Sequence, residues 1–384
     1  MATTSRAKLY CRALASVGDS VRVMLTTVSE RPPNILNKES RGIVEGIPFE
    51  YTTGTPVRPE SFLWRRFVEM RGTVVAIGRL ITLRRSRRRI AILAYLDASR
   101  WRPRYLVLAV CAWVLHIPVL LDLREAPWPL RADRRPWERI PSPLALTSGA
   151  ITISRYLTRW TSTEYASRHS SATATEIPIL VDVDEVHPSP YPVSGKGALY
   201  AVSSGYDDSL AFVLQAMRHV WTREPLCRLV ITGIDSRTLD HHLGELAFSD
   251  AERAGVAAVG WVDRGSLLQL YSEASVCLAP LFDDQRSEAR FPTKIGEYAA
   301  AARPVVTSSV GEIKRYLEDG MTAFVAEPGD AAAFGRKIVE ALSNPELAGS
   351  VGQRARDLAE EHFDYRVHAA RLHEAMTRAL DLLT

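Results

Sequence analysis

The sequence has few cysteines, and they form no pattern. Only Cys11, Cys111, Cys227 and Cys277 occur among 384 residues, with no CxxC pair. This spacing excludes a disulfide scaffold and a zinc ribbon and favours a reducing compartment. The pair His241-His242 has no third ligand near it in the sequence, so no metal site is predicted. The sequence also lacks a GxGxxG motif and a Walker loop, which argues against NAD binding and P-loop chemistry.

Long hydrophobic runs are lacking as well. The longest, residues 105–121, has 17 residues and contains His116 and Pro118, whereas a membrane-spanning helix needs ~20. It predicts a buried helix, a turn at Pro118 and a buried strand. Basic side chains interrupt the first residues, and no apolar signal-peptide core follows them. We therefore predict a cytoplasmic protein, with contact at the inner face of the membrane as an open possibility.

Acidic residues are scarce in one half only. Residues 1–150 hold 25 Lys and Arg against 12 Asp and Glu, a net charge of +13, whereas residues 151–384 have a net charge of −9. This difference predicts an anionic partner for the first half. Residues 61–89 hold nine arginines, interspersed with apolar residues such as Trp64 and Phe67. They favour an anionic membrane surface, with a solvated helix and loop as the alternative. No recognition motif accompanies the charge, so no nucleic-acid partner is predicted.

The length fits two domains, and strands alternate with helices along both halves. Apolar stretches predict strands at residues 21–25, 46–51, 90–97, 118–123, 150–153, 199–203, 227–233, 256–262, 276–281, 304–308 and 323–326. Such alternation predicts doubly wound parallel α/β domains. Residues 178–197 are rich in proline and have no helical period, so they form the predicted linker. The predicted organisation is an N-terminal domain 1–177, a linker 178–197, a C-terminal domain 198–365 and a closing helix 366–384.

The chain opens in a predicted helix, because Tyr10, Ala13, Leu14 and Val17 follow a helical period. A parallel α/β domain ordinarily opens with a strand. We therefore expect in-frame codons upstream of Met1 to encode that strand, and a stop codon just before Met1 would refute this.

Residues 290–308 read RFPTKIGEYAAAARPVVTS and carry the strongest motif. They follow the predicted strand 276–281, so they emerge at the carboxyl edge of the sheet, where α/β domains bind ligands. Thr293 is the predicted N-cap of the next helix, and Lys294 and Glu297 share a face in its first turn. Free N–H groups, the helix dipole and a cation favour a diphosphate, and Glu297 can accept from both hydroxyls of a ribose. A surface Lys–Glu pair is the alternative.

This stretch resembles the signature of retaining glycosyltransferases of family 4, also called glycosyl transferases group 1, which have the two-domain GT-B fold. Further matches cover nearly the full chain. They are residues 118–125, 150–154, 259–262, 270–271, 274–276, 311–313, 320 and 324–325.

The resemblance implies two Rossmann-like domains facing across a cleft, with a nucleotide sugar in the second domain and an acceptor in the first. It implies transfer of a hexose from a UDP-, GDP- or dTDP-linked donor to a glycan or lipid-linked acceptor, with retention of configuration. Polysaccharide or cell-envelope glycan biosynthesis is the expected setting. No metal or other cofactor is expected, because the enzyme stabilises charge on the leaving diphosphate, which takes the acceptor proton itself.

The candidate site residues divide into two sets. The resemblance implies that Glu297 binds the ribose and that Lys294 lies near the diphosphate, and Arg290 is a candidate to supply positive charge that many relatives have elsewhere. The other donor-side candidates are Gly205, Val262, Asp284, Glu288, Pro292 and Thr293. The acceptor-side candidates are Asp122, Arg124, Glu125 and Ser154.

The sequence departs from the family pattern at two places. Ala289 stands where many relatives have a glutamate, and residues 203–209 contain no cation where many relatives have Arg and Lys. Two alternatives therefore remain: a non-catalytic GT-B protein that scaffolds a glycan assembly complex, and a transferase that acts on a small soluble acceptor.

Overall fold

The computed structural model describes residues 2–30, 32, 35–86, 89–95, 103–125, 143–192, 197–202 and 207–382, and it forms two compact units. We call them the C-terminal unit (Met1–Arg6, Ile153–Tyr156 and Pro178–Val367) and the N-terminal unit (Ala7–Thr152, Leu157–Ile177 and His368–Thr384). The chain thus passes between the units five times, after residues 6, 152, 156, 177 and 367.

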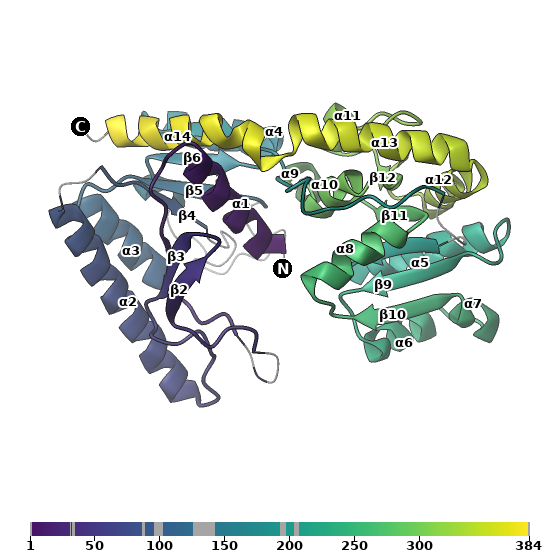
Figure 1. Ribbon diagram of the computed structural model, residues 1–384, viewed down its shortest axis with the longest axis horizontal. Helices are drawn as coiled ribbons and strands as arrows, with labels where there is room; N and C mark the ends of the chain where they lie inside the picture. Colours follow the sequence, from purple (N-terminus) through teal and green to yellow (C-terminus); the bar gives the residue numbers. More distant parts are fainter. Residues whose placement is uncertain are drawn as a thin grey trace. The chain divides into compact units, whose positions relative to one another are not determined.

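The C-terminal unit is built on a six-stranded sheet (Figure 1). Its strands are β8 (Gly197–Ala201), β9 (Arg228–Thr232), β10 (Val256–Gly260), β11 (Val276–Ala279), β12 (Val305–Ser308) and β13 (Phe324–Ala326). All pairings are parallel, in the order β10-β9-β8-β11-β12-β13. Chain order therefore reverses between β8 and β11. Ligands of such sheets bind outside the carboxyl ends of the strands at this switch point.

Helices cover this sheet and complete its core. They are α5 (Asp207–Trp221), α6 (Ser236–Glu245), α7 (Asp250–Ala254), α8 (Arg264–Glu273), α9 (Gln285–Ala289), α10 (Thr293–Ala300), α11 (Ile313–Tyr316), α12 (Ala331–Ser343) and α13 (Pro345–His362). A 3₁₀ turn, η3 (Tyr365–His368), follows them. Val213 of α5 and Phe334 of α12 pack with Leu229 and Leu278 of the sheet in one buried cluster. Burial on both faces explains why the central strands β8 and β11 are continuous apolar runs.

The N-terminal unit contains a four-stranded parallel sheet and a smaller three-stranded one. The first consists of β4 (Ile92–Ala94), β5 (Val119–Leu123), β6 (Gly149–Thr152) and β7 (Thr173–Glu176), in that order. The second consists of β1 (Val23–Leu25), β3 (Ile47–Tyr51) and β2 (Arg41–Val44), in that order.

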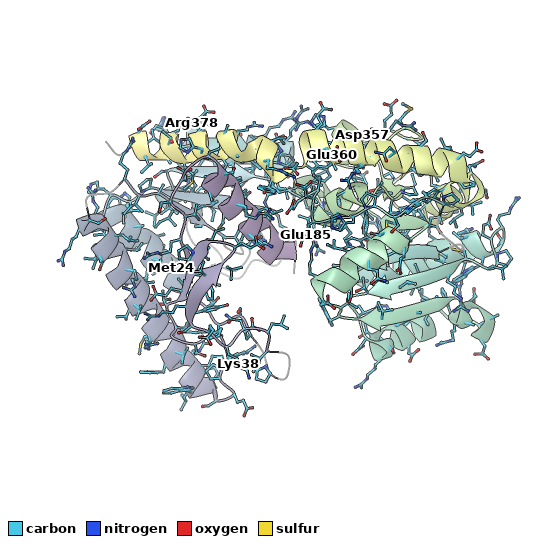
Figure 2. All side chains as sticks on the ribbon, viewed as in Figure 1. Met24, Lys38, Glu185, Asp357, Glu360 and Arg378 are labelled. Carbon is cyan, nitrogen blue, oxygen red and sulfur yellow. The ribbon has the colours of Figure 1, made fainter. Side chains whose placement is uncertain are left out.

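The remaining elements surround these two sheets. They are α1 (Ala2–Ser16), α2 (Phe62–Arg85), α3 (Pro103–Val114), η2 (Pro143–Leu146), α4 (Arg155–Ser167) and α14 (Ala369–Asp381). Helix α14 packs against β5, and its Arg378 (Figure 2) donates to Thr175 Oγ1 of β7 at 3.1 Å. The last helix of the chain is therefore part of the N-terminal unit.

The predicted α/β class with parallel sheets is confirmed, and the differences have physical reasons. Strands β2 and β7 were not predicted, because their sequences, RGIV and TATE, contain no apolar run or full alternation. The prediction that the helix of residues 105–121 is buried is wrong for α3: Ala112 is buried but Trp113 is 63% exposed. Only one face of α3 reaches the core. Among the described residues, no helix is both long and apolar enough to cross a bilayer.

Candidate functional site

Helix α10 carries the central candidates and lies inside the C-terminal unit. Its N-cap is Pro292, in extended conformation, and Thr293 is its first helical residue. The prediction that Thr293 caps this helix is therefore wrong. The residues of α10 from Ile295 to Ala300 are all buried, and the helix packs on α13, α8 and strands β11 and β12. A Cβ at Gly296 would lie 3.2 Å from Ile179 Cδ1, so a glycine allows residue 179 to approach the helix closely.

Lys294 lies at the switch point of the sheet. Its Nζ donates to the carbonyl oxygen of Ala201, the last residue of β8, at 2.5 Å, and lies 5.0 Å from the centroid of the Tyr200 ring. Strand β8 borders β11, where the chain order reverses. The ammonium group is thus at the sheet edge where doubly wound domains bind their ligands.

The pKa of Lys294 falls to about 7. Burial and the positive charge of Arg290 lower this pKa, and the carboxylate of Glu297 acts in the opposite direction. The three predicted catalytic residues are therefore within electrostatic range of one another. An anion that binds here favours the charged form of the lysine.

Glu297 is held at both oxygens by protein groups. It is 8% exposed. Its Oε1 accepts from Arg264 Nη1 at 2.6 Å and its Oε2 accepts from the Tyr271 hydroxyl at 3.1 Å. Burial raises the pKa of Tyr271 well above its ordinary value, and the Glu297 charge adds to this, so Tyr271 is a neutral donor. A carboxylate has about four lone-pair sites, so Glu297 can still accept from a ligand.

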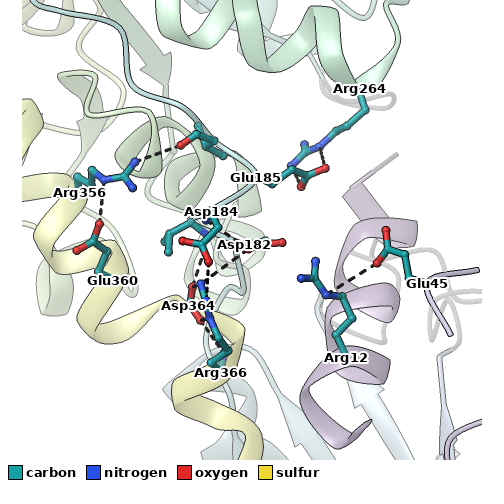
Figure 3. Close-up of polar contacts among 12 residues, drawn as sticks. Arg12, Glu45, Asp182, Asp184, Glu185, Arg264, Arg356, Glu360, Asp364 and Arg366 are labelled. Carbon is teal, nitrogen blue, oxygen red and sulfur yellow. Dashed lines mark hydrogen bonds and ion pairs between the residues drawn. The ribbon is translucent and has the colours of Figure 1, made fainter. Parts of the chain in front are cut away.

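Arg264, the first residue of α8, joins Glu297 to a second carboxylate. Its Nη2 pairs with Glu185 Oε2 at 3.0 Å, and Figure 3 shows the two side chains pointing toward each other. Burial alone would lower the pKa of Arg264, but the carboxylates of Glu297 and Glu185 raise it above its ordinary value. Sequence reasoning missed Arg264 and Glu185, which have no motif signal. Tyr271 belongs to a matched motif, and that was the available signal for it.

The other donor-side candidates have local partners. Asp284 caps α9 and accepts from the Ser287 backbone N–H at 2.6 Å. Glu288 Oε1 accepts from the Gly311 N–H at 3.3 Å. Gly311 has φ +55°, and a Cβ there would lie 3.3 Å from Glu288 Cα, so both conformation and space require glycine.

Two candidates remain on the donor side. Val262 follows β10 and is half-buried, and Gly205 lies outside the described residues. The base-side role of Val262 and the role of Gly205 stay predictions.

Three of the acceptor-side candidates belong to the N-terminal unit. Asp122 is fully buried, accepts from the Tyr10 hydroxyl at 2.7 Å and lies 3.1 Å from Arg124 Nε. Arg124 Nη1 also donates to the Tyr95 hydroxyl at 3.0 Å, and Glu125 is exposed. The Asp122 carboxylate thus orients Arg124, which is the more accessible of the two.

Ser154 has a different location from the other acceptor-side candidates. It belongs to the C-terminal unit, where it is fully buried, and its Oγ donates to the Ala289 carbonyl at 2.8 Å. The next residue, Arg155, donates its backbone N–H to Glu312 Oε1 at 2.6 Å. Ser154 therefore contacts the segment that carries the donor-side candidates, and its acceptor-side role stays a prediction.

The described part of the chain contains no group of three His, Cys, Asp or Glu side chains arranged to hold a metal ion. The expectation of metal-independent chemistry stays a prediction.

Solved structures of other proteins share this fold. Sucrose-phosphate synthase from Thermosynechococcus elongatus matches with a TM-score of 0.67 and 17% identity, over 98% of this chain and 93% of that one. Anabaena Alr3699/HepE, solved with UDP and glucose, matches with a TM-score of 0.61 and 15% identity, over 86% of each chain. The fold is therefore GT-B, with two Rossmann-like units.

One family model matches within the C-terminal unit. Residues 197–344 match the model described as glycosyl transferases group 1, the family that the motifs of this part of the chain predicted. Phosphatidyl-myo-inositol mannosyltransferase of Mycobacterium leprae is 28% identical over 222 residues, which are 56% of this chain. This match spans 53% of that relative's own length.

The Arg264–Glu297 pair gives a first testable prediction. Arg264→Met leaves a buried carboxylate with one fewer partner, and we expect it to lower the free energy of unfolding by ~3–5 kcal/mol. In a chain that already carries Glu297→Gln, Arg264→Met should lower the free energy of unfolding by less, and the difference is a coupling energy of ~1–3 kcal/mol. Urea denaturation of the four proteins measures this cycle. Arg336→Met, at an exposed pair with Asp330, is the control and should change stability by less than ~1 kcal/mol. Additive single effects would contradict the assignment.

Lys294 gives a prediction about pH. Its pKa falls from an ordinary 10.5 to about 7 in the folded chain, so the unfolded chain binds more protons between these values. The contribution of Lys294 to the free energy of unfolding therefore rises with pH across this window, by at most ~1.4 kcal/mol per pH unit. We expect Lys294→Met to flatten the rise, measured by urea denaturation from pH 7 to 10. The exposed Lys314→Met serves as control, and an unchanged slope in Lys294→Met would refute the prediction.

Proposed function

We propose that this chain is a retaining glycosyltransferase that moves a hexosyl group from a nucleotide sugar to a glycan or lipid-linked acceptor. One observation carries the proposal: Lys294 and Glu297 lie on one helix at the switch point of a glycosyl transferases group 1 domain. The C-terminal unit binds the donor and the N-terminal unit binds the acceptor. We assign the reaction to the cytoplasm, in polysaccharide or cell-envelope glycan synthesis.

Different site residues bind the diphosphate and the ribose of the donor. Lys294, Arg290 and the free N–H groups at the start of α10 bind the diphosphate, because all three favour negative charge. Glu297 accepts from the ribose hydroxyls, while Arg264 and Tyr271 hold its carboxylate in place. Fixed partners of this kind reduce the rearrangement that binding requires.

The transfer step follows from this arrangement. The bond between the anomeric carbon and the diphosphate oxygen breaks, and negative charge develops on the diphosphate. Lys294 and Arg290 stabilise that charge. The acceptor hydroxyl oxygen then bonds to the anomeric carbon on the same face, and its proton passes to the leaving diphosphate. No protein base and no metal ion is required for this step.

UDP is the first nucleotide to test, because HepE, a protein of the same fold, was solved with UDP and glucose. GDP and dTDP are the other two. The lipid-linked acceptor has support from the mannosyltransferase relative, whose name specifies a phosphatidyl-inositol substrate.

Nucleotide binding tests the proposal, measured by titration calorimetry with UDP, GDP, dTDP and the matching nucleosides. We expect at least one of the nucleotides to bind. Glu297→Gln should weaken nucleoside and nucleotide binding alike, by ~10–100-fold, because it removes charge-assisted hydrogen bonds to the ribose. Lys294→Met should weaken binding of the nucleoside diphosphate by a similar factor and leave binding of the nucleoside unchanged.

The matched control is Glu273→Gln, which changes an exposed glutamate of α8 outside the site. Release of nucleoside diphosphate from the matching nucleotide sugar should be lost in Glu297→Gln and kept in the control. Failure of all three nucleotides to bind would refute the proposal and favour a non-catalytic scaffold. Equal affinity in Glu297→Gln and the control would refute the ribose assignment alone.

A further inference from the structure

Helix α2 has two apolar faces, and only one of them is covered. Its buried residues Val68, Gly72, Ala76 and Leu80 follow a four-residue spacing along the inner face. A second apolar stripe consists of Leu63, Phe67, Met70 and Val74, spaced i, i+4, i+7 and i+11, which places it on the opposite face. All four are exposed, Leu63 at 78% and Val74 at 64%. A helix that only packs on its own core has no need of the second stripe.

Helix α3 repeats this arrangement beside it. Its exposed apolar residues are Leu106, Val107, Val110, Trp113 and Val114, which share one face at helical spacing. Ala112 on its other face is buried and belongs to the same cluster as Leu80 of α2, against which Met24 of β1 (Figure 2) also packs. The two helices pack against each other, as Figure 1 shows. Because Leu80 and Ala112 meet in this cluster, the outer faces of both helices point away from it.

We call this surface, the outer residues of α2 and α3, the α2–α3 face. Helix α2 is basic, with six arginines and one glutamate, and its Arg79 pairs with Glu50 of β3. Arg84 and Arg85 in its last turn are exposed. The guanidinium group of Arg66 lies over the Phe62 ring, 5.1 Å from its centroid, and the Trp64 and Phe67 rings stack at 5.1 Å. Exposed apolar area of this extent, rimmed by charge, marks an interaction surface.

We propose that the α2–α3 face docks on an anionic lipid bilayer. Arginine at the rim with Trp, Phe and Leu at the centre is the composition of helices that lie in the interface of a membrane. Trp64 and Trp113 have the amphipathic rings that concentrate at headgroup level. The net charge of +13 over residues 1–150 acts in the same direction.

A second copy of the chain fits this face less well than a bilayer does. A two-fold dimer would bring the same basic margin against itself, and like charges in contact repel each other. An anionic bilayer neutralises the margin while it covers the apolar centre. The proposal does not depend on glycosyl transfer, because it uses no residue of the candidate donor site.

Sedimentation with lipid vesicles tests the proposal that the α2–α3 face docks on an anionic bilayer. We expect the full chain to sediment with vesicles of phosphatidylcholine and phosphatidylglycerol, and to bind vesicles of phosphatidylcholine alone much less. Added salt should reduce binding. Arg84→Gln and Arg85→Gln should each weaken binding about fivefold. Phe67→Ser, Met70→Ser and Trp113→Ser should each weaken it about tenfold.

The controls are Leu226→Ser and Met321→Ser, which remove exposed apolar side chains of the C-terminal unit and should leave vesicle binding unchanged. Circular dichroism and nucleotide titration on all variants separate loss of docking from loss of folding or of the donor site. The proposal would be overturned if the wild-type protein does not bind anionic vesicles. It would also be overturned if the α2–α3 variants bind these vesicles as well as the controls do. A concentration-dependent dimer that the same substitutions abolish would also overturn it, by assigning the face to a second copy.

Discussion

A charged side chain that folding removes from water requires a partner of opposite charge or a hydrogen bond, and α10 carries two such side chains. Lys294 donates to the carbonyl of Ala201 at the end of β8, and Glu297 accepts from Arg264 and Tyr271 of α8. These contacts fix α10 to the edge of the sheet where its order reverses. Folding and the candidate site therefore depend on the same contacts, and the groups that we assign to the donor are held in place before it arrives.

A second polar cluster in the C-terminal unit extends this arrangement to the segment after Ile177. Arg366 pairs with Asp364 at 2.8 Å and with Asp184 at 2.6 Å (Figure 3). The Val181 N–H donates to the Phe363 carbonyl at 2.8 Å. These contacts join two segments of the C-terminal unit that are distant in sequence, residues 181–184 and 363–366. The same segment carries Glu185 to Arg264, so part of the predicted linker supports the site.

Much of the fold was predictable because it depends on local patterns. Continuous apolar runs such as β8 and β11 identify strands buried on both faces, and the motif around Lys294 and Glu297 predicts the family whose model matches residues 197–344. The partners of these two residues were not predictable, because Arg264 is 33 residues from Glu297 and has no motif. The exposure of α3 was also not predictable: its apolar run predicts burial, and only the structure shows that the side chains on one face of the helix are exposed. The contact between Ser154 and Ala289 was not predictable for a similar reason, because the two residues are 135 positions apart in the sequence.

The central claim is that Lys294 binds the diphosphate of a nucleoside diphosphate and Glu297 binds its ribose. A crystal structure of the chain with UDP tests it most directly. We expect diphosphate oxygens within hydrogen-bond distance of Lys294 Nζ and both ribose hydroxyls on the Glu297 carboxylate, with Arg264 still bound to that carboxylate. UDP bound away from α10, or a Glu297 carboxylate that keeps only its protein partners while UDP occupies the unit, would contradict the claim.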